Sequence, residues 1–365
     1  MEITTPAKHS DKLLGHKSVE AMLVRQIEQG NLPHAMLFCG PKGIGKATMA
    51  YRLAKFLAIG GSLIPKEPSN ALFDDLPPIP SEHSLAVDNN HPAISRIENN
   101  SHGDVMTITP QWDERKKAFK NDILVDDVRK VGHFLSLTPS ECNYRIVIID
   151  AADELNISSA NAILKLLEEP PQNALMILIS HQPGKLLPTI RSRCRTLTFV
   201  PPSQEQFDEI LKLEDDLISE KERQALYILS NGSPGFALAL ASGEALALYS
   251  EQMEASLNPS HEQLQAFASA ALSKKYPHRW AHFRHCWFAL LNRVMLQRQQ
   301  VLGGEMYPKE AEQLDALGAR LSMDEWMQLW QDSERLFSRT DAVYLDPQLT
   351  VQQLFGALSG QAIRI

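Results

Sequence analysis

Residues 35–56, AMLFCGPKGIGKATMAYRLAKF, decide the fold of this 365-residue chain. Residues 35–39 are an apolar run that predicts a buried strand, and residues 47–56 place apolar side chains at helical spacing. The segment between them is rich in glycine. A strand, a glycine-rich loop and a helix in this order predict a phosphate loop, because the backbone N–H groups and the helix N-terminus both attract an anion. A turn that merely joins a strand to a helix is the alternative.

The loop predicts a nucleotide site with weakened metal binding. The phosphate-loop pattern G-x-x-x-x-G-K continues with Ser or Thr, whose hydroxyl holds Mg²⁺, but this chain has Ala47 there. Thr48 comes one residue late, and one step along a helix is a rotation of roughly 100°. We therefore do not expect Thr48 to point toward the metal, whereas a lysine in the loop would reach the outer phosphates. The nucleotide-binding residues predicted in the loop itself are Gly40, Gly43, Gly45 and Lys46.

Residues 145–150, RIVIID, predict a second part of the same site, an apolar strand that ends in Asp150. A carboxylate in this position supports Mg²⁺ in phosphate-loop ATPases. The residue that follows is a Glu that positions the attacking water in many of these enzymes, and here it is Ala151. Asp153 and Glu154 come later and are uncertain substitutes, because they are expected to lie beyond the strand end.

Strands and helices alternate up to residue 202, which predicts a doubly wound α/β unit with a parallel sheet and its ligand edge at the strand carboxyl ends. Residues 175–180, LMILIS, add a buried strand, and its terminal Ser180 occupies the position of a residue that senses the γ-phosphate. Residues 60–92 are rich in proline and predict an irregular insertion. A surface loop is the favoured interpretation of this insertion, and a docking segment is the alternative.

The remainder of the chain predicts helices only. Residues 203–244 are expected to form a small helical lid domain, and residues 245–365 an all-α collar domain used for oligomerisation. Three histidines recur there at a spacing typical of metal ligands. A helical wheel places them opposite an apolar stripe, on the face expected to meet water, so no metal site is predicted; they are His278, His282 and His285. The stripe is either an interface or an internal core, and it consists of Trp280, Phe283, Trp287, Leu290, Leu291 and Val294.

Residues 156–169, NISSANAILKLLEE, predict a helix. Ser158 or Ser159 is the expected cap, because a hydroxyl can accept a hydrogen bond from a free backbone N–H of the first turn. Two prolines, Pro170 and Pro171, end the helix because proline cannot continue it.

The composition is that of an ordinary soluble protein, with 44% hydrophobic and 22% charged residues. The net charge of −8 and the pI of about 5.9 argue against a generic DNA binder, since phosphate contacts need clustered Lys and Arg. Four cysteines without a C-x-x-C pair fit a reduced, cytoplasmic protein. We expect neither export nor a membrane span, because the chain has no secretion signal at its N-terminus and no apolar run of ~18 residues.

Four segments together resemble AAA+ proteins, and more closely the clamp-loader subunits of bacterial DNA polymerase III. They are LLGH (13–16), LPHAMLFCGPKGIGKATMA (32–50), VIIDAADELNISSANAILKLLEEPP (147–171) and LISHQPGKLLPTIRSRC (178–194). The triplet Ser192-Arg193-Cys194 is the most telling part. In this family its arginine reaches ATP held by a neighbouring subunit, where a planar cation offsets the charge that develops on the transferred phosphoryl group. The resemblance therefore implies that Arg193 is a catalytic arginine finger acting in trans.

Three departures separate the chain from the ATP-hydrolysing subunits of the family. Ala47 and Ala151 replace the metal hydroxyl and the water-positioning Glu, and residues 232–235, GSPG, lack the second sensor Arg of a Gly-Ser-x-Arg pattern. The resemblance then implies the family's stator, a subunit with little or no ATP hydrolysis of its own. Many relatives also carry a four-cysteine zinc module that this sequence lacks, so no zinc is expected. Whether ATP or ADP binds, with weak or absent Mg²⁺, is left open.

The resemblance also implies partners. They are the gamma/tau ATPase and delta subunits in a hetero-oligomeric ring, with the sliding clamp and primer-template DNA reached through the complex and no membrane involved. The chain would then belong to a DNA-directed DNA polymerase holoenzyme that acts in DNA replication, without being catalytic alone. The alternative is a self-sufficient AAA+ motor of the gamma/tau type, in which Thr48 or Glu154 assists Lys46 and Asp150. A small-molecule phosphotransferase ranks last, because it leaves the helical C-terminal part unexplained.

Overall fold

The computed structural model divides into two compact units, one that extends to Gln206 and one that begins at Phe207. The three-part division with boundaries after residues 202 and 244 stays a prediction. None of the helices in the described part of the chain combines the length and apolar character that a membrane span requires. Of the predicted insertion at 60–92, the part at 61–83 lies outside the described residues. These are residues 7–10, 13–60, 84–113, 118–119, 122–258, 264–265, 267–269, 279–343, 346–358 and 363.

A five-stranded parallel sheet in the order β2-β5-β6-β1-β7 forms the centre of the first unit. The central strands β1 and β6 are buried along their whole length, as expected where helices cover both faces of a parallel sheet. The predicted parallel α/β sheet is therefore confirmed. Its strands are β1 (Ala35–Cys39), β2 (Val105–Ile108), β5 (Arg145–Asp150), β6 (Ala174–Ser180) and β7 (Arg195–Thr198), and β3 (Trp112–Asp113) pairs separately with β4 (Ala118–Phe119).

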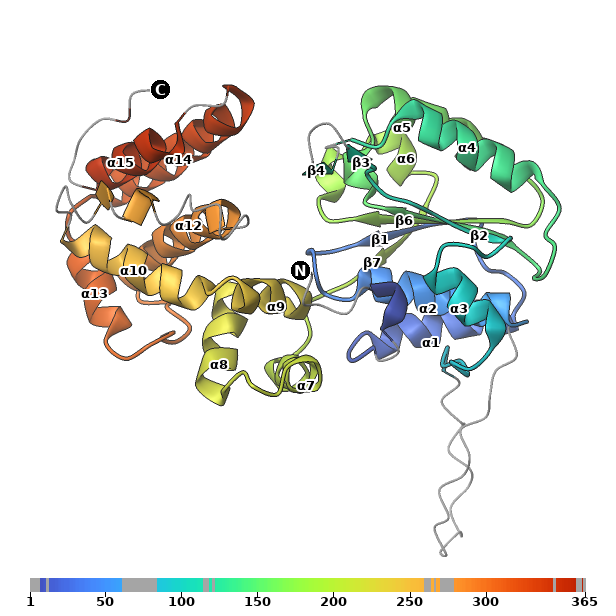
Figure 1. Ribbon diagram of the computed structural model, residues 1–365, viewed down its shortest axis with the longest axis horizontal. Coiled ribbons are helices and arrows are strands. Elements are labelled where there is room, and N and C mark those ends of the chain that lie inside the picture. The colour runs from blue at the N-terminus through green and yellow to red at the C-terminus, as the bar shows by residue number, and fades with distance from the viewer. Residues whose placement is uncertain are drawn as a thin grey trace, which may run out of the picture. The chain divides into compact units, whose positions relative to one another are not determined.

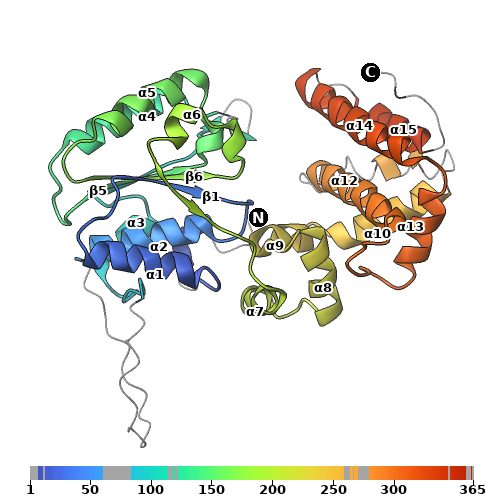
Figure 2. The ribbon, with the colours of Figure 1, turned by 180° about the vertical axis from the view of Figure 1, so that it is seen from behind.

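Helices cover the sheet on both faces, and a hydrophobic cluster fills the space beneath each layer. One layer consists of α1 (Lys17–Glu28), α2 (Lys46–Ala58) and α3 (Pro92–Glu98) (Figure 1). The other consists of α4 (Val125–Ser136), α5 (Ile157–Glu168) and α6 (Pro188–Arg191), and the view from behind shows the same division (Figure 2). The described residues of the unit also form the short 3₁₀ helices η1 (Ala7–His9), η2 (Ala152–Glu154) and η3 (Pro183–Lys185).

Glu20 in α1 binds residues 84 and 85, the first described residues after the gap at 61–83. Its Oε1 accepts hydrogen bonds from Arg52 Nε at 3.0 Å, Ser84 Oγ at 3.0 Å and Leu85 N at 2.9 Å. Leu85 itself is fully buried in the cluster beneath α1 and α2. The returning chain is thereby tied to α1 and α2.

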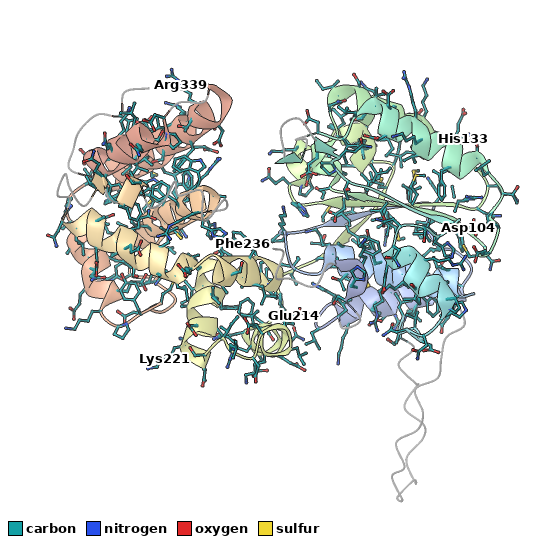
Figure 3. All side chains as sticks on the ribbon, in the orientation of Figure 1. Asp104, His133, Glu214, Lys221, Phe236 and Arg339 are labelled. Carbon is teal, nitrogen blue, oxygen red and sulfur yellow. The ribbon has the colours of Figure 1, made fainter. Side chains whose placement is uncertain are left out.

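Asp104, labelled in Figure 3, fixes the start of β2 against the turn that precedes β5. Its buried carboxylate accepts hydrogen bonds from the backbone N–H groups of Ser140, Glu141 and Cys142 at 2.9, 2.6 and 3.1 Å. Burial alone would raise the pKa of Asp104, but these hydrogen bonds lower it below its usual value. The folded structure therefore favours the ionised form of the Asp104 carboxylate.

The second unit is helical, and its helices share one hydrophobic cluster that extends from Phe207 to Leu358. The apolar stripe predicted in the collar belongs to this core, since Phe283, Trp287 and Leu290 are fully buried and Trp280 is half-buried. Of the two interpretations of the stripe, the internal core is therefore the one that the structure shows. The helices are α7 (Gln204–Glu214), α8 (Glu220–Leu229), α9 (Pro234–Ser242), α10 (Ala245–Leu257), α12 (Arg279–Arg298), α13 (Glu310–Gly318), α14 (Met323–Val343) and α15 (Pro347–Ala357).

The predicted exposure of the histidines on α12 is wrong. His282 is buried beside Gly243, and His285 lies within hydrogen-bond distance of the Leu229 carbonyl, with 2.6 Å from Nε2 to the oxygen. The physical reason is that α12 packs against α10, α13 and α14, so it buries more than the one stripe that the wheel identified. His278 lies outside the described residues. Among the residues that the structure describes, no group of His, Cys, Asp and Glu could hold a metal ion.

Candidate nucleotide-binding and arginine-finger sites

The predicted phosphate loop lies between the carboxyl end of β1 and the start of α2. Gly40, Gly43 and Gly45 have φ values of 148°, 81° and 99°, a region that glycine enters at little cost and that strains other residues. Gly40 also lies so close to Phe199 that a Cβ atom would overlap the Phe199 carbonyl oxygen. Both the backbone angles and the close contact therefore require glycine in this loop.

Lys46 begins α2, and its side chain folds back over the loop. Its Nζ donates hydrogen bonds to the carbonyl oxygens of Gly40, at 2.6 Å, and of Pro41, and the residue is 2% exposed. Burial lowers the pKa of Lys46 to about 8, against the opposite influence of Asp150 and Asp153. The ammonium group that would reach the outer phosphates is thus bound by carbonyl groups of its own loop.

Asp150 and Ser180 lie at the same edge of the sheet as the loop. Ser180 pairs with Cys39 at the end of β1, and Asp150 pairs with Ile179, the residue before Ser180. Burial raises the pKa of Asp150, and the nearby Glu154 carboxylate adds to this effect. Thr48 is half-buried in the first turn of α2. The fold therefore brings the predicted loop, acid and sensor positions to one edge.

Asp153 is a site residue whose role the sequence did not reveal. Its Oδ1 accepts a hydrogen bond from Ser180 Oγ at 2.6 Å, and its Oδ2 accepts from the backbone N–H groups of His181 and Gln182. The hydroxyl expected to sense a γ-phosphate is therefore already engaged by a carboxylate of the same chain. The sequence offers no local pattern for this contact, because Asp153 and Ser180 are far apart in the chain and meet only when β5 and β6 pair.

A cavity of about 490 Å³ lies next to the loop, along β1 and β7. Its polar lining includes His181, Arg191, Thr196 and Thr198, together with Gly40 and Pro41 of the loop. Burial lowers the pKa of His181 to about 4, and the positive charge of Lys46 contributes, so this imidazole is neutral at physiological pH. Arg191 is the arginine of residues 191–195 that lines this cavity.

Arg193 lies away from the loop, where the chain enters β7. Strand β7 runs parallel to β1, from Arg195 opposite Met36 to Thr198 opposite Cys39. Arg193 therefore lies at the amino end of the sheet, whereas the phosphate loop follows Cys39 at the carboxyl end. A strand of this length separates the two by roughly 13 Å.

The Ser192-Arg193-Cys194 triplet divides into one inward and two outward side chains. Cys194 packs on the cluster beneath α4 and α5, and burial raises the pKa of its thiol to about 12. Ser192 Oγ donates a hydrogen bond to the Thr189 carbonyl at 3.1 Å. The Arg193 side chain is 36% exposed and pairs with Glu168 at the end of α5, with 2.7 Å from Nη2 to Oε1. The guanidinium group is thus held at the surface.

A glycine-rich loop after β1, an acid at the end of β5 and a polar residue at the end of β6 define a phosphate-loop α/β domain with a parallel sheet. A helical region follows it in the chain. This combination confirms the fold class expected from the sequence.

Comparison with known proteins identifies the particular relatives. Residues 79–203 match the family described as DNA polymerase III, delta subunit. The chain is 31% identical over 214 residues to DNA polymerase III subunit delta' of Bacillus subtilis, an alignment that covers 58% of this chain and 56% of that protein. It is 29% identical over 231 residues to the tau subunit of the same organism, an alignment that covers 63% of this chain and 36% of that protein. A crystal structure of a gamma subunit-related protein from Thermotoga maritima covers 95% of this chain and 99% of that one, with a TM-score of 0.40 and 16% identity.

The resemblance to the delta' subunit of bacterial DNA polymerase III is confirmed by these matches. The chain spans about half the length of the delta' relatives and about a third of the tau relative. The matched part includes Asp150 at the end of β5, Ser180 at the end of β6, and Arg193 in the turn between α6 and β7.

Proposed function

We propose that this chain is the delta' subunit, or stator, of a DNA polymerase III clamp loader. It hydrolyses little or no ATP and lends Arg193 to ATP bound by a neighbouring gamma/tau-type subunit while the sliding clamp is loaded onto primed DNA. The delta subunit completes the proposed ring. The similarity to delta' proteins and the Ser192-Arg193-Cys194 triplet support this proposal.

The main support for the proposed trans-acting role is the location of Arg193, away from the phosphate loop of its own chain. An arginine finger must contact the phosphoryl group that is transferred, and Arg193 lies at the opposite end of β7 from its own phosphate loop. It is partly exposed, so a phosphate group on another subunit could reach it. A planar guanidinium group that contacts the γ-phosphate stabilises the charge of the transition state.

The state of the chain's own nucleotide site supports a low rate of hydrolysis. Lys46 is bonded to loop carbonyl groups, and Ser180 is bonded to Asp153. Ala47 and Ala151 bring no polar side chain to the positions that hold Mg²⁺ and orient water in active relatives. ATP binding would first have to displace Lys46 from these carbonyl groups.

The first test is ATP hydrolysis, measured for the purified chain alone and then for the clamp loader assembled with its partner subunits on primed DNA. We expect negligible turnover by the chain alone. Arg193→Ala should lower the ATPase rate of the assembly by about 10³-fold per affected site, the lower end of the effect of arginine fingers in other phosphate-loop enzymes. The assembly containing Lys46→Ala should retain most of its activity and serves as the control.

A self-sufficient ATPase motor is the second candidate. The similarity to the tau subunit and the shared edge of Lys46, Asp150 and Ser180 favour it. It requires robust turnover by the isolated chain and loss of that turnover in Lys46→Ala. Such a result, together with normal ATPase activity of an assembly containing Arg193→Ala, would overturn the stator proposal.

A further inference from the structure

Three arginines occupy alternate positions in residues 191–195, RSRCR, and the structure treats them differently. Arg193 donates from Nη1 to the Thr189 carbonyl at 3.1 Å and pairs through Nη2 with Glu168 Oε1 at 2.7 Å. Within the described part of the chain, no carboxylate pairs with Arg191 or Arg195. Of the three arginines, Arg193 is therefore the one that a carboxylate of the described chain binds, and it is the proposed arginine finger.

We propose that Glu168 is a positioning residue that aims the Arg193 guanidinium at the phosphate of the neighbouring subunit. This inference rests on the proposed function. Glu168 is the last residue of α5, a helix that packs against the sheet and α6. Its backbone position is therefore fixed by the packing of the helix. The carboxylate and the Thr189 carbonyl bind the two terminal nitrogens of the guanidinium, which fixes both its location and the direction of its plane.

The pair leaves the arginine available to a partner. The side chains of Arg193 and Glu168 are 36% and 49% exposed. An incoming phosphate can therefore approach the guanidinium without first unfolding any part of the chain. A deeply buried pair would instead have to break before the arginine could act.

The expected benefit is one of preorganisation. A free arginine on the surface samples many rotamers, and this freedom must be lost when it contacts the transition state. If Glu168 removes part of that freedom beforehand, the interaction acts on the chemical step and leaves ATP binding almost unchanged. Because a pair at the surface is weak, the benefit should be far smaller than that of the finger itself.

The adjacent residue supplies a matched control. Glu169 is the C-cap residue of α5, is also exposed, and no contact joins its carboxylate to Arg193 among the described residues. Glu168→Gln and Glu169→Gln therefore remove the same charge from neighbouring positions. Only the first removes the charge that faces the guanidinium.

The experiment measures steady-state ATP hydrolysis by the clamp loader assembled with wild-type partner subunits on primed DNA, with kcat and KM determined separately. Glu168→Gln should lower kcat by about 3- to 10-fold, an effect of the size of a lost positioning contact, and leave KM for ATP unchanged. Glu169→Gln should match the wild type. A kcat of Glu168→Gln that equals or exceeds the wild-type value would overturn the proposal.

A double-mutant cycle with Arg193→Ala separates positioning from a general structural role. If Glu168 acts through Arg193, Glu168→Gln should cause no further loss in the Arg193→Ala background. An equal loss in both backgrounds would show that Glu168 acts elsewhere and would overturn the proposal. An assembly whose ATPase is unaffected by Arg193→Ala would instead overturn the proposed function, so the two failures are distinguishable.

Discussion

At the scale of single residues, Asp153 has the largest effect on the interpretation of the nucleotide site. Ser180 is predicted to sense the γ-phosphate, but its hydroxyl donates to Asp153 at 2.6 Å. The same carboxylate accepts two backbone N–H groups at the end of β6. A charged acceptor that satisfies three donors stabilises this end of the strand, because an unpaired donor at a partly buried position is costly.

Asp153→Asn should lower the free energy of unfolding by about 1 kcal/mol, because a neutral amide oxygen is a weaker acceptor for the two backbone N–H groups than the carboxylate, and an amide nitrogen replaces the oxygen that accepts from Ser180 Oγ. Urea unfolding at neutral pH measures the change. Glu154→Gln is the control, because its carboxylate lies near Asp150 and, among the described residues, accepts one long hydrogen bond, from Ala151 N at 3.4 Å. The control should stay within about 0.5 kcal/mol of the wild type. Equal stability of the two variants would show that the Asp153 hydrogen bonds do not stabilise the fold.

The sequence predicted the positions of the site residues better than their contacts. The common edge of Lys46, Asp150 and Ser180 follows from the strand–loop–helix order, since parallel strands end together. The hydrogen bonds of Lys46 to its own loop depend on a side-chain rotamer, and a sequence motif does not encode one. The Asp153 contact depends on β5 and β6 lying side by side, and Glu168 meets Arg193 only because α5 packs against α6.

At the scale of elements, α5 shows how the N-cap of a correctly predicted helix can be misassigned by two or three residues. The sequence favoured Ser158 or Ser159 as the cap, but Asn156 is the N-cap residue, and its Oδ1 accepts a hydrogen bond from Ser159 N at 2.9 Å. Ser159 is buried and Ser158 is exposed, both inside the helix. Asn, Ser and Thr all cap well, so composition alone could not decide among them. Asn156 precedes the first helical residue and has the extended backbone that a cap requires.

Asn156→Ala should lower the free energy of unfolding by about 1 kcal/mol, the usual cost of losing an N-cap side chain. Urea unfolding followed by far-UV circular dichroism would measure it. Ser158→Ala is the matched control, because its exposed side chain lies two residues beyond the cap. If Ser158→Ala costs as much as Asn156→Ala, the assignment of the cap from the structure is wrong.

The apolar stripe of α12 predicted only part of the surface that this helix buries. The Trp and Phe residues of the stripe are in the core as the spacing indicated, yet the opposite side of the helix is also covered. Phe236 of α9 stacks edge-on against His285, with 4.6 Å between the ring centroids. A helical wheel assumes one buried face, and it fails for a helix that is surrounded by neighbours.

At the scale of the whole molecule, the two compact units have separate hydrophobic clusters. The clusters of the first unit contain residues up to Phe199, and the helical cluster begins at Phe207. A local defect in one cluster is therefore expected to weaken that unit first. Four of the five tryptophans, Trp280, Trp287, Trp326 and Trp330, belong to the helical unit, so tryptophan fluorescence reports mainly on it.

Gly243→Ala should destabilise the helical unit by about 1–3 kcal/mol, the usual cost of forcing extra volume into a packed site. A Cβ atom at Gly243 would overlap the ring of the buried His282. Urea unfolding followed by fluorescence should show an earlier transition. Gly303→Ala is the control, because a Cβ atom there meets nothing within 4 Å, and it should unfold like the wild type. Identical transitions for both variants would contradict the close packing at Gly243.

The hydrogen bonds of Glu20 have a practical consequence for work on this protein. The chain leaves the end of α2 near Gly60 and is tied down again at Ser84 and Leu85 by a carboxylate on α1. Both attachment points belong to the helical layer and neither belongs to the phosphate loop. The interval between them is therefore a place to graft a fluorophore or an affinity tag, because the Glu20 contacts are expected to keep the chain on either side attached to α1 and α2, away from the predicted nucleotide-binding edge of the sheet.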